Sequence, residues 1–291
     1  MRVVELYATS KCNHKCKHCY INFESSWNPE DLTNTAISLG EQGYKVKVNG
    51  AEVLTNPNYL KAYKAVGQNF VFSNGIVLAN DICGEVFTQL KYYDIETIHI
   101  SHHFDSIDAL NGVPCDIVEK AIYNAQINGF FTELHTTITS LNFDKVERMC
   151  DYAYEKKCLG IKYFPLAKVG VAQKLPSELF LSLDQKKYFY HLLLESRKKY
   201  PMEILDIRAS GDFENVSNKF WCFFGQDHIS ITSDRMIYGC PFGVGNSSPI
   251  GFLNQDNVIV IENDFNFNRK KCYLHGFGVC IGECNYSSFP R

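Results

Sequence analysis

Short apolar runs alternate with amphipathic segments over the first two thirds of the chain. Runs rich in Val, Ile, Phe, Tyr and Thr are typical of buried strands. Six such runs predict strands, at Val3–Ala8, Lys45–Asn49, Phe70–Ser73, Thr97–Ser101, Thr132–Ile138 and Gly160–Phe164. Between them, apolar residues recur at the spacing of an α-helix. That spacing predicts helices over Pro29–Gln42, Asn58–Val66, Ile82–Tyr92, Cys115–Asn128 and Asn142–Lys156.

This alternation of strand and helix predicts an α/β fold with a parallel sheet and helices outside it. Six units are too few for a closed eight-fold barrel, so we expect a partial (βα)6 TIM barrel. In such sheets, catalytic and binding residues gather at the carboxyl ends of the strands. A longer helix is predicted at Leu183–Lys199, just before Pro201.

After Pro201 the pattern changes. Asn, Ser, Gly and aromatic residues become more frequent, and the helical period fades. His228–Thr232 and Met236–Tyr238 predict a β-hairpin around Ser233 and Asp234. We therefore expect two domains: the partial barrel at residues 1–201, and a small cysteine-rich domain of hairpin and loop at residues 202–291.

Composition and charge exclude several classes of protein. With 291 residues, 45% of them hydrophobic and 21% charged, the chain can bury a sizeable core. A net charge of -3 argues against a broad basic surface, so no nucleic-acid partner is expected. No apolar run reaches the roughly 18 residues of a membrane span, and residues 1–10 resemble a strand rather than a signal peptide. A cytoplasmic protein without a membrane partner is expected.

Twelve cysteines are unusual for such a protein. Without an export signal, metal ligation is favoured over a disulfide scaffold. Cys83, Cys115, Cys150 and Cys158 stand alone in or near predicted helices, where cysteine usually behaves as a small buried hydrophobe. The other cysteines form two groups.

The first group is a Cys-x3-Cys-x2-Cys loop made of Cys12, Cys16 and Cys19, directly after the first strand. Three thiolates on one loop can hold three irons of a [4Fe–4S] cluster and leave the fourth iron open to a small molecule. Zinc is the competing metal. Structural zinc needs four protein ligands, and His14 or His18 could supply the fourth.

This loop, with the aromatic Tyr20 after it, resembles that of the radical S-adenosylmethionine (SAM) superfamily. The resemblance implies that the open iron of a [4Fe–4S] cluster binds SAM. It implies that an electron, delivered by an external reductant such as flavodoxin or ferredoxin, cleaves SAM to a 5′-deoxyadenosyl radical. That radical then removes a hydrogen atom from the substrate, while Tyr20 lies beside the adenine.

Three further strand ends resemble motifs of the same superfamily. Asn49-Gly50-Ala51-Glu52 is a degenerate form of its Gly-Gly-Glu-Pro motif, without the first Gly and the Pro, and implies that Glu52 binds the SAM ammonium group. Ser73-Asn74-Gly75 is similar to its Thr-Asn-Gly turn, and Ser101 to a serine that contacts SAM. The candidate SAM-binding residues are Tyr20, Asn49, Gly50, Glu52, Ser73, Asn74 and Ser101. The roles of His99, His102 and His103 stay open.

The second group of cysteines resembles the twitch and SPASM extensions of these enzymes, which carry auxiliary clusters. Its five members are Cys222, Cys240, Cys272, Cys280 and Cys284. The resemblance implies one auxiliary [4Fe–4S] cluster held by Cys222, Cys240, Cys280 and Cys284. Cys272 either replaces Cys280 as a ligand or is a spare thiol, and zinc is the alternative metal.

The resemblance extends to peptide-modifying enzymes of the epipeptide epimerase kind. It implies a ribosomally made peptide substrate and either epimerisation or cross-linking and oxidation. In an epimerase, Cys272 is the candidate catalytic thiol that returns a hydrogen atom, since Cys240 is followed by Pro241 rather than a second cysteine. The alternatives are dehydrogenation of a small alcohol or aminocyclitol, and a non-catalytic iron–sulfur or zinc-binding protein.

Overall fold

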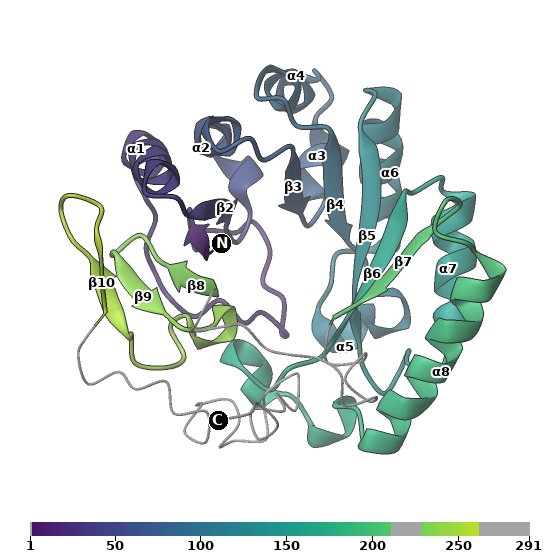
Figure 1. The fold of residues 1–291 in the computed structure, drawn as a ribbon. Helices are drawn as coiled ribbons and strands as arrows, with labels where there is room; N and C mark the ends of the chain where they lie inside the picture. Colours follow the sequence, from purple (N-terminus) through teal and green to yellow (C-terminus); the bar gives the residue numbers. More distant parts are fainter. Residues whose placement is uncertain (1, 211–227, 262–291) are drawn as a thin grey trace.

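The computed structural model describes residues 2–210 and 228–261, and its strands form an inner layer surrounded by helices (Figure 1). The strands are β1 (Val3–Tyr7), β2 (Lys45–Asn49), β3 (Phe70–Ser73), β4 (Thr97–Ser101), β5 (Phe131–Ile138), β6 (Gly160–Pro165), β7 (Asp206–Ala209), β8 (His228–Ile231), β9 (Met236–Tyr238), β10 (Gly251–Leu253) and β11 (Ile259–Ile261). The α-helices are α1 (Pro29–Glu41), α2 (Leu60–Ala65), α3 (Ile76–Asn80), α4 (Glu85–Tyr92), α5 (Ile107–Leu110), α6 (Cys115–Ile127), α7 (Val146–Glu155) and α8 (Leu183–Lys199).

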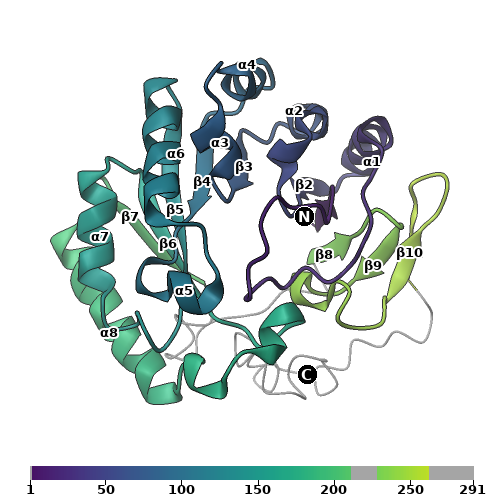
Figure 2. The same cartoon turned by 180° about the vertical axis from the view of Figure 1, so that it is seen from behind.

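The partial (βα)6 barrel predicted from the sequence is confirmed. Strands β3 to β7 form a parallel five-stranded sheet in chain order. A second sheet has the order β11-β10-β9-β8-β1-β2, in which β1 pairs in parallel with both β2 and β8. The helices cover the outer face of this arc, and the view from behind shows the same layering (Figure 2).

Two predicted helix starts are wrong, because the side chains of Asp81 and Asn142 bond the backbone in the turns that precede the helices. Ile82 is 91% exposed and lies outside any helix, and α4 begins only at Glu85. The Asp81 carboxylate accepts the backbone N–H groups of Glu85, Val86 and Phe87, which is how an N-terminal cap works. Likewise α7 begins at Val146, not at Asn142, because the Asn142 side chain bonds the backbone around Thr139.

The four isolated cysteines divide into two pairs. Cys150 and Cys158 are buried, as expected of small apolar side chains. Cys83 and Cys115 are exposed, so the prediction that they are buried is wrong. Cys83 lies in the turn before α4, and Cys115 is the first residue of α6, where a side chain does not face the core.

Strands β2 and β3 are neighbours along the chain but belong to different sheets. A buried glutamine spans this seam. The Gln68 side-chain amide accepts from the Val48 N–H (2.8 Å) and donates to the Val48 carbonyl (3.0 Å) and the Phe70 carbonyl (3.2 Å). Gln68 thus gives the middle of β2 the hydrogen bonds that a neighbouring strand would otherwise provide.

Residues beyond 201 add strands to both edges of the barrel sheet. Strand β7 pairs with β6, and β8 pairs with β1, while β9 to β11 continue from β8 as an antiparallel extension. The predicted hairpin is confirmed as β8 and β9. The division at residue 201 stays a prediction. Among the described residues, no helix is long and apolar enough to cross a membrane.

Candidate functional site

The three cysteines of the first loop lie just beyond the carboxyl end of β1. Cys12 is exposed, Cys16 and Cys19 are half-buried, and none of the three forms a disulfide. Burial, together with the nearby Cys19 and Cys12, raises the pKa of Cys16 to about 12. Burial also raises the pKa of Cys12 and of Cys19. These thiols therefore need a bound cation to become thiolates, as they do in metal sites.

The loop is tied to the end of α5 by three hydrogen bonds. Lys17 N–H donates to the Leu110 carbonyl (2.8 Å). The His14 Nε2 donates to the Asn111 carbonyl (2.8 Å), and the Asn111 side chain donates to the Lys15 carbonyl (2.6 Å). The His18 ring also bonds the Leu110 backbone. Each of these contacts uses one ring nitrogen, and the buried His18 Nδ1 has no hydrogen-bond partner among the described residues. A histidine that ligates a metal usually bonds a backbone group through its other nitrogen, so zinc remains the alternative metal for this loop.

The end of the same loop packs tightly on the segment after β6. Val171 N–H donates to the Cys19 carbonyl (3.1 Å). Gly170 has a φ of +56°, and a Cβ on it would lie 2.6 Å from the Cys19 carbonyl oxygen and 2.9 Å from the Tyr20 Cα. Only glycine fits this contact without displacing the backbone that carries Cys19.

The tail segment after β9 reaches the loop from its other side. Asn246 donates to the Tyr20 carbonyl (2.9 Å), and the Asn22 side chain donates to the Gly245 carbonyl (3.1 Å). The Tyr20 ring packs edge-on against Phe242 (5.1 Å between centroids), and its hydroxyl bonds that of Tyr7 (3.2 Å). Cys240 lies in this segment, at the start of a short 3-10 helix, Pro241–Gly243.

Glu52 is fully buried at the carboxyl end of β2. Its Oε2 accepts from the Asn74 N–H (2.7 Å) and the Ser73 hydroxyl (3.2 Å), and its Oε1 accepts from the Leu54 N–H (3.4 Å). Burial raises the pKa of Glu52 to about 7, against these hydrogen bonds, which lower it. The carboxylate thus joins the ends of β2 and β3. Its predicted contact with the SAM ammonium group stays a prediction.

Asn74 connects these strand ends to the cysteine loop. Its side-chain amide donates to the Asn13 Oδ1 (2.7 Å) and to the Cys12 Sγ (3.5 Å), while His14 N–H donates to the same sulfur (3.4 Å). Next to this contact is a hollow of about 540 Å³ lined by Lys11, Cys12 and Tyr59, among others. The ends of β1, β2 and β3 therefore meet around Cys12.

The other predicted SAM-binding residues make contacts of their own. The Asn49 side chain donates to Glu5 on β1, and Gly50 packs so closely on Thr9 that a Cβ on it would lie 3.3 Å from the Thr9 carbonyl oxygen. Ser101 ends β4 beside His135 of β5. Their roles stay predictions. Four predicted cysteines, Cys222, Cys272, Cys280 and Cys284, lie outside the described residues.

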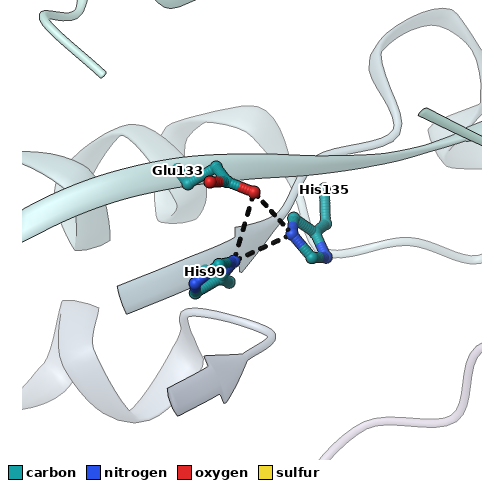
Figure 3. A group of neighbouring side chains, drawn as sticks. All are labelled: His99, Glu133 and His135. Atoms are coloured by element: carbon teal, nitrogen blue, oxygen red, sulfur yellow. Dashed lines mark hydrogen bonds and ion pairs between the residues drawn. The ribbon is translucent and has the colours of Figure 1, made fainter. Parts of the chain in front are cut away.

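A second polar cluster, which the sequence analysis missed, lies inside the barrel (Figure 3). His99 of β4 and Glu133 and His135 of β5 bring three ligand-type atoms within 4.8 Å of one another. Burial alone raises the pKa of Glu133, but hydrogen bonds from His135 and His99 hold it well below its usual range. Burial lowers the pKa of His135 to about 4. The sequence did carry a signal for this cluster. Glu133 and His135 are polar residues at alternate positions of one strand, whereas parallel strands are normally apolar on both faces.

The two histidines after β4 lie elsewhere. His102 is buried and stacks on Phe104, with 3.9 Å between ring centroids. His103 is buried against His18, with 4.4 Å between centroids. Of the three histidines left open by the sequence, only His99 belongs to the cluster inside the barrel.

Comparison with known proteins confirms the fold predicted from the cysteine loop. SuiB from Streptococcus suis bound to precursor peptide SuiA has a TM-score of 0.73 at 14% identity, over 93% of this chain and 66% of that one. Native anSMEcpe with bound S-adenosylmethionine has a TM-score of 0.63 at 16% identity, over 96% and 88%. The resemblance to radical SAM enzymes is thus confirmed at the level of the fold.

In sequence, the chain is 26% identical over 221 residues to the Fe-coproporphyrin III synthase of Methanosarcina barkeri. This match covers 70% of the chain and 55% of that protein, so the chain spans about half of its curated relative. No family model matches the chain.

Proposed function

We propose that this protein is a radical SAM enzyme in which Cys12, Cys16 and Cys19 hold a [4Fe–4S] cluster. The observation that carries the proposal is the position of the three thiols. They lie at the carboxyl end of β1, in a fold shared with proteins solved with bound S-adenosylmethionine. When bound, the cluster supplies the electron for reductive cleavage of SAM.

The chain's own residues shape this site in three ways. The Asn74 side chain donates an N–H hydrogen bond to the Cys12 sulfur. Hydrogen bonds of this kind change the reduction potential of an iron–sulfur cluster. Glu52 fixes the turn that carries Asn74. Gly170 lets the segment after β6 approach the Cys19 carbonyl, which orients the third thiol. Tyr20, Asn49, Gly50, Ser73 and Ser101 complete the proposed SAM-binding set.

A peptide is the substrate that the fold comparisons favour. SuiB, the neighbour with a TM-score of 0.73, was solved with a precursor peptide, and anSMEcpe was solved with peptides in other structures. We propose epimerisation or cross-linking and oxidation of a ribosomally made peptide, with flavodoxin or ferredoxin as reductant. The auxiliary cluster (Cys222, Cys240, Cys280, Cys284) and the hydrogen-donating Cys272 belong to this proposal.

The test is SAM cleavage by protein reconstituted with iron and sulfide without oxygen. After reduction with dithionite, the wild type should form 5′-deoxyadenosine, and Cys16→Ala should form none, because the cluster loses one of its three protein ligands. Cys83→Ala is the matched control, since Cys83 is an exposed cysteine away from the loop. Equal cleavage by Cys16→Ala and the wild type would refute the assignment.

A second candidate substrate, a tetrapyrrole, is favoured by the match to Fe-coproporphyrin III synthase. To distinguish the two candidate substrates, each is added in turn to the reduced enzyme with SAM. A peptide substrate predicts a changed peptide mass or deuterium uptake from solvent at an α-carbon. A porphyrin-dependent rise in 5′-deoxyadenosine, with no effect of peptide, would select the tetrapyrrole.

A further inference from the structure

The polar cluster inside the barrel brings three ligand atoms together at short range. The His99 Nδ1 lies 2.9 Å from the His135 Nε2 and 3.3 Å from the Glu133 Oε1, and the same His135 nitrogen lies 2.9 Å from that oxygen. Figure 3 shows all three side chains pointing at one central spot. The three atoms thus form a small triangle.

With Glu133 ionised, as its ion pair with Arg208 favours, no placement of protons makes every side of this triangle a hydrogen bond. An ionised Glu133 can only accept, and each imidazole nitrogen carries either a hydrogen or a lone pair. If both nitrogens carry hydrogens, the two hydrogens face each other across 2.9 Å. If either lacks its hydrogen, its lone pair faces the carboxylate oxygen. A cation bound to all three atoms removes this conflict, because it accepts a lone pair from each of them.

The surroundings of the cluster have the features of a metal site. The second oxygen of Glu133 is bonded by Arg208, which leaves Oε1 for another partner. A carboxylate ligand oriented by a hydrogen bond of its own is typical of metal centres. The side chains of His99, His135 and Glu133 are 12%, 13% and 7% exposed, so the cluster is mostly buried yet open to a small ion.

The cluster occupies the inner face of the barrel. Ile98 and Ile100, on either side of His99, are fully buried in the core, and α6 packs against β4. Side chains alternate along a strand, so His99 faces the opposite way. There it contacts the Phe70 and Phe72 rings, with 5.1 and 5.0 Å between centroids. An apolar rim of this kind limits water and strengthens electrostatic contacts within it.

We propose that His99 Nδ1, His135 Nε2 and Glu133 Oε1 bind one divalent transition-metal ion. Two histidines and one carboxylate are the ligand set of many iron and zinc sites, and three protein ligands leave a position open for water or a substrate oxygen. This site is separate from the cysteine loop and does not depend on the proposed SAM chemistry.

Charged side chains near the cluster affect its affinity for a metal ion. Lys162 of β6 lies beside His135 in the sheet, and Arg208 lies beside Lys162. Both are cationic and oppose a metal ion. Glu133 offsets one of these charges, and Asp206, paired with Arg208 at 2.9 Å, offsets the other. Lys47 also acts on Lys162, so three cations and two carboxylates surround the imidazoles, and the remaining positive charge weakens metal binding.

The test uses zinc as the probe and the reconstituted full chain. After equilibrium dialysis against Zn²⁺ and removal of loosely bound ion, zinc per chain is counted for the wild type, His135→Ala and Glu133→Gln. We expect each variant to hold one zinc fewer than the wild type. Zinc held by cysteines is common to all samples and cancels in the difference. His191→Ala, an exposed histidine on α8, is the control and should match the wild type.

Folding is checked separately with His99→Gln, which keeps a polar side chain of similar size. Zinc should raise the Tm of the wild type and of His191→Ala by the same amount, and should raise the Tm of His99→Gln by less, because only zinc held by cysteines remains in that variant. Iron content and SAM cleavage, measured on the same samples, report on the cysteine loop alone. Equal zinc in the wild type and all cluster variants, or a zinc-dependent Tm rise in His99→Gln as large as that of the wild type, would overturn the proposal.

Discussion

At the scale of single residues, Glu52 is the side chain whose environment departs most from what its sequence position suggests. A strand-end carboxylate is usually solvated, but this one is fully buried and holds the turn after β3. Its sequence neighbours indicate a ligand-binding acid. The structure adds a second role, because the same oxygen that accepts from Asn74 fixes the donor on Cys12.

The buried carboxyl predicts a pH-dependent stability. Its folded-state pKa of about 7 lies above the ordinary 4.5, so between these values the folded chain keeps a proton that the unfolded chain releases. The free energy of unfolding therefore falls as pH rises through this range. The Glu52→Gln variant has no carboxyl to ionise, so its free energy of unfolding does not fall in this way. The free energy of unfolding of the variant minus that of the wild type should therefore increase by about 3 kcal/mol from pH 5 to pH 8.

Urea unfolding at several pH values measures this difference. Glu41→Gln, an exposed carboxyl at the end of α1, is the matched control. A stability difference between Glu52→Gln and the wild type that does not change with pH would contradict the buried, proton-binding carboxyl.

Gly170 gives a second prediction at this scale. Gly170→Ala should move the backbone of Cys19, because the new Cβ would lie 2.6 Å from its carbonyl oxygen. We expect a loss of about 2–4 kcal/mol in the free energy of unfolding, and less iron bound after reconstitution. Gly67→Ala is the control, since Gly67 also has a positive φ but open space around it. It should lose only about 1–2 kcal/mol and keep its iron. Equal iron loss in both variants would argue against a role for this contact.

At the scale of elements, the hydrogen bonds across the seam between β2 and β3 come from one side chain, that of Gln68. Gln68→Ala leaves the buried N–H and carbonyl of Val48 without their partners. We expect a loss of about 2–6 kcal/mol in the free energy of unfolding, at about 1–3 kcal/mol for each of the two unpaired groups. Chemical denaturation measures it, and Gln89→Ala on the exposed side of α4 should change stability by less than about 0.5 kcal/mol. A small effect of Gln68→Ala would mean that water replaces the amide.

The sequence predicted the elements of the barrel well, and physical reasons explain what it missed. Strands β2, β3 and β4 have the predicted bounds because each is a short apolar run between clear turns. Strands β7, β10 and β11 were missed, because the sequence after residue 201 was expected to form only one hairpin and loop. The pairing of β8 with β1 joins residues more than 220 positions apart, and no local pattern encodes such a partner.

In the candidate site, too, local sequence predicted one part and missed another. The spacing of Cys12, Cys16 and Cys19 identified the loop from local sequence alone. The cluster of His99, Glu133 and His135 depends on the register between β4 and β5, in which His99 lies beside Glu133 and Ser101 beside His135. Register follows from the assembled sheet, so the ligand set emerges only in the structure.

At the scale of the whole molecule, the two groups of cysteines predict how iron divides. Replacing Cys12, Cys16 and Cys19 together by alanine should halve the iron content, because the proposed auxiliary cluster remains. Iron and sulfide analysis after reconstitution measures this. The double variant Cys83→Ala, Cys115→Ala changes two exposed cysteines outside both groups and should keep all its iron. Complete loss of iron in the triple variant would show that no auxiliary cluster exists.

The pairing of β1 with β8 also has a consequence for biosynthesis. Strand β1 and the cysteine loop are synthesised before their partners, β8 and the Gly245–Asn246 segment, which follow more than 220 residues later. At the usual speed of translation this is a wait of about 10 to 50 s. Until then the loop that carries the three thiols lacks its hydrogen bonds with Gly245 and Asn246. Metal delivered after release from the ribosome would therefore meet an ordered set of ligands, whereas metal arriving earlier would not.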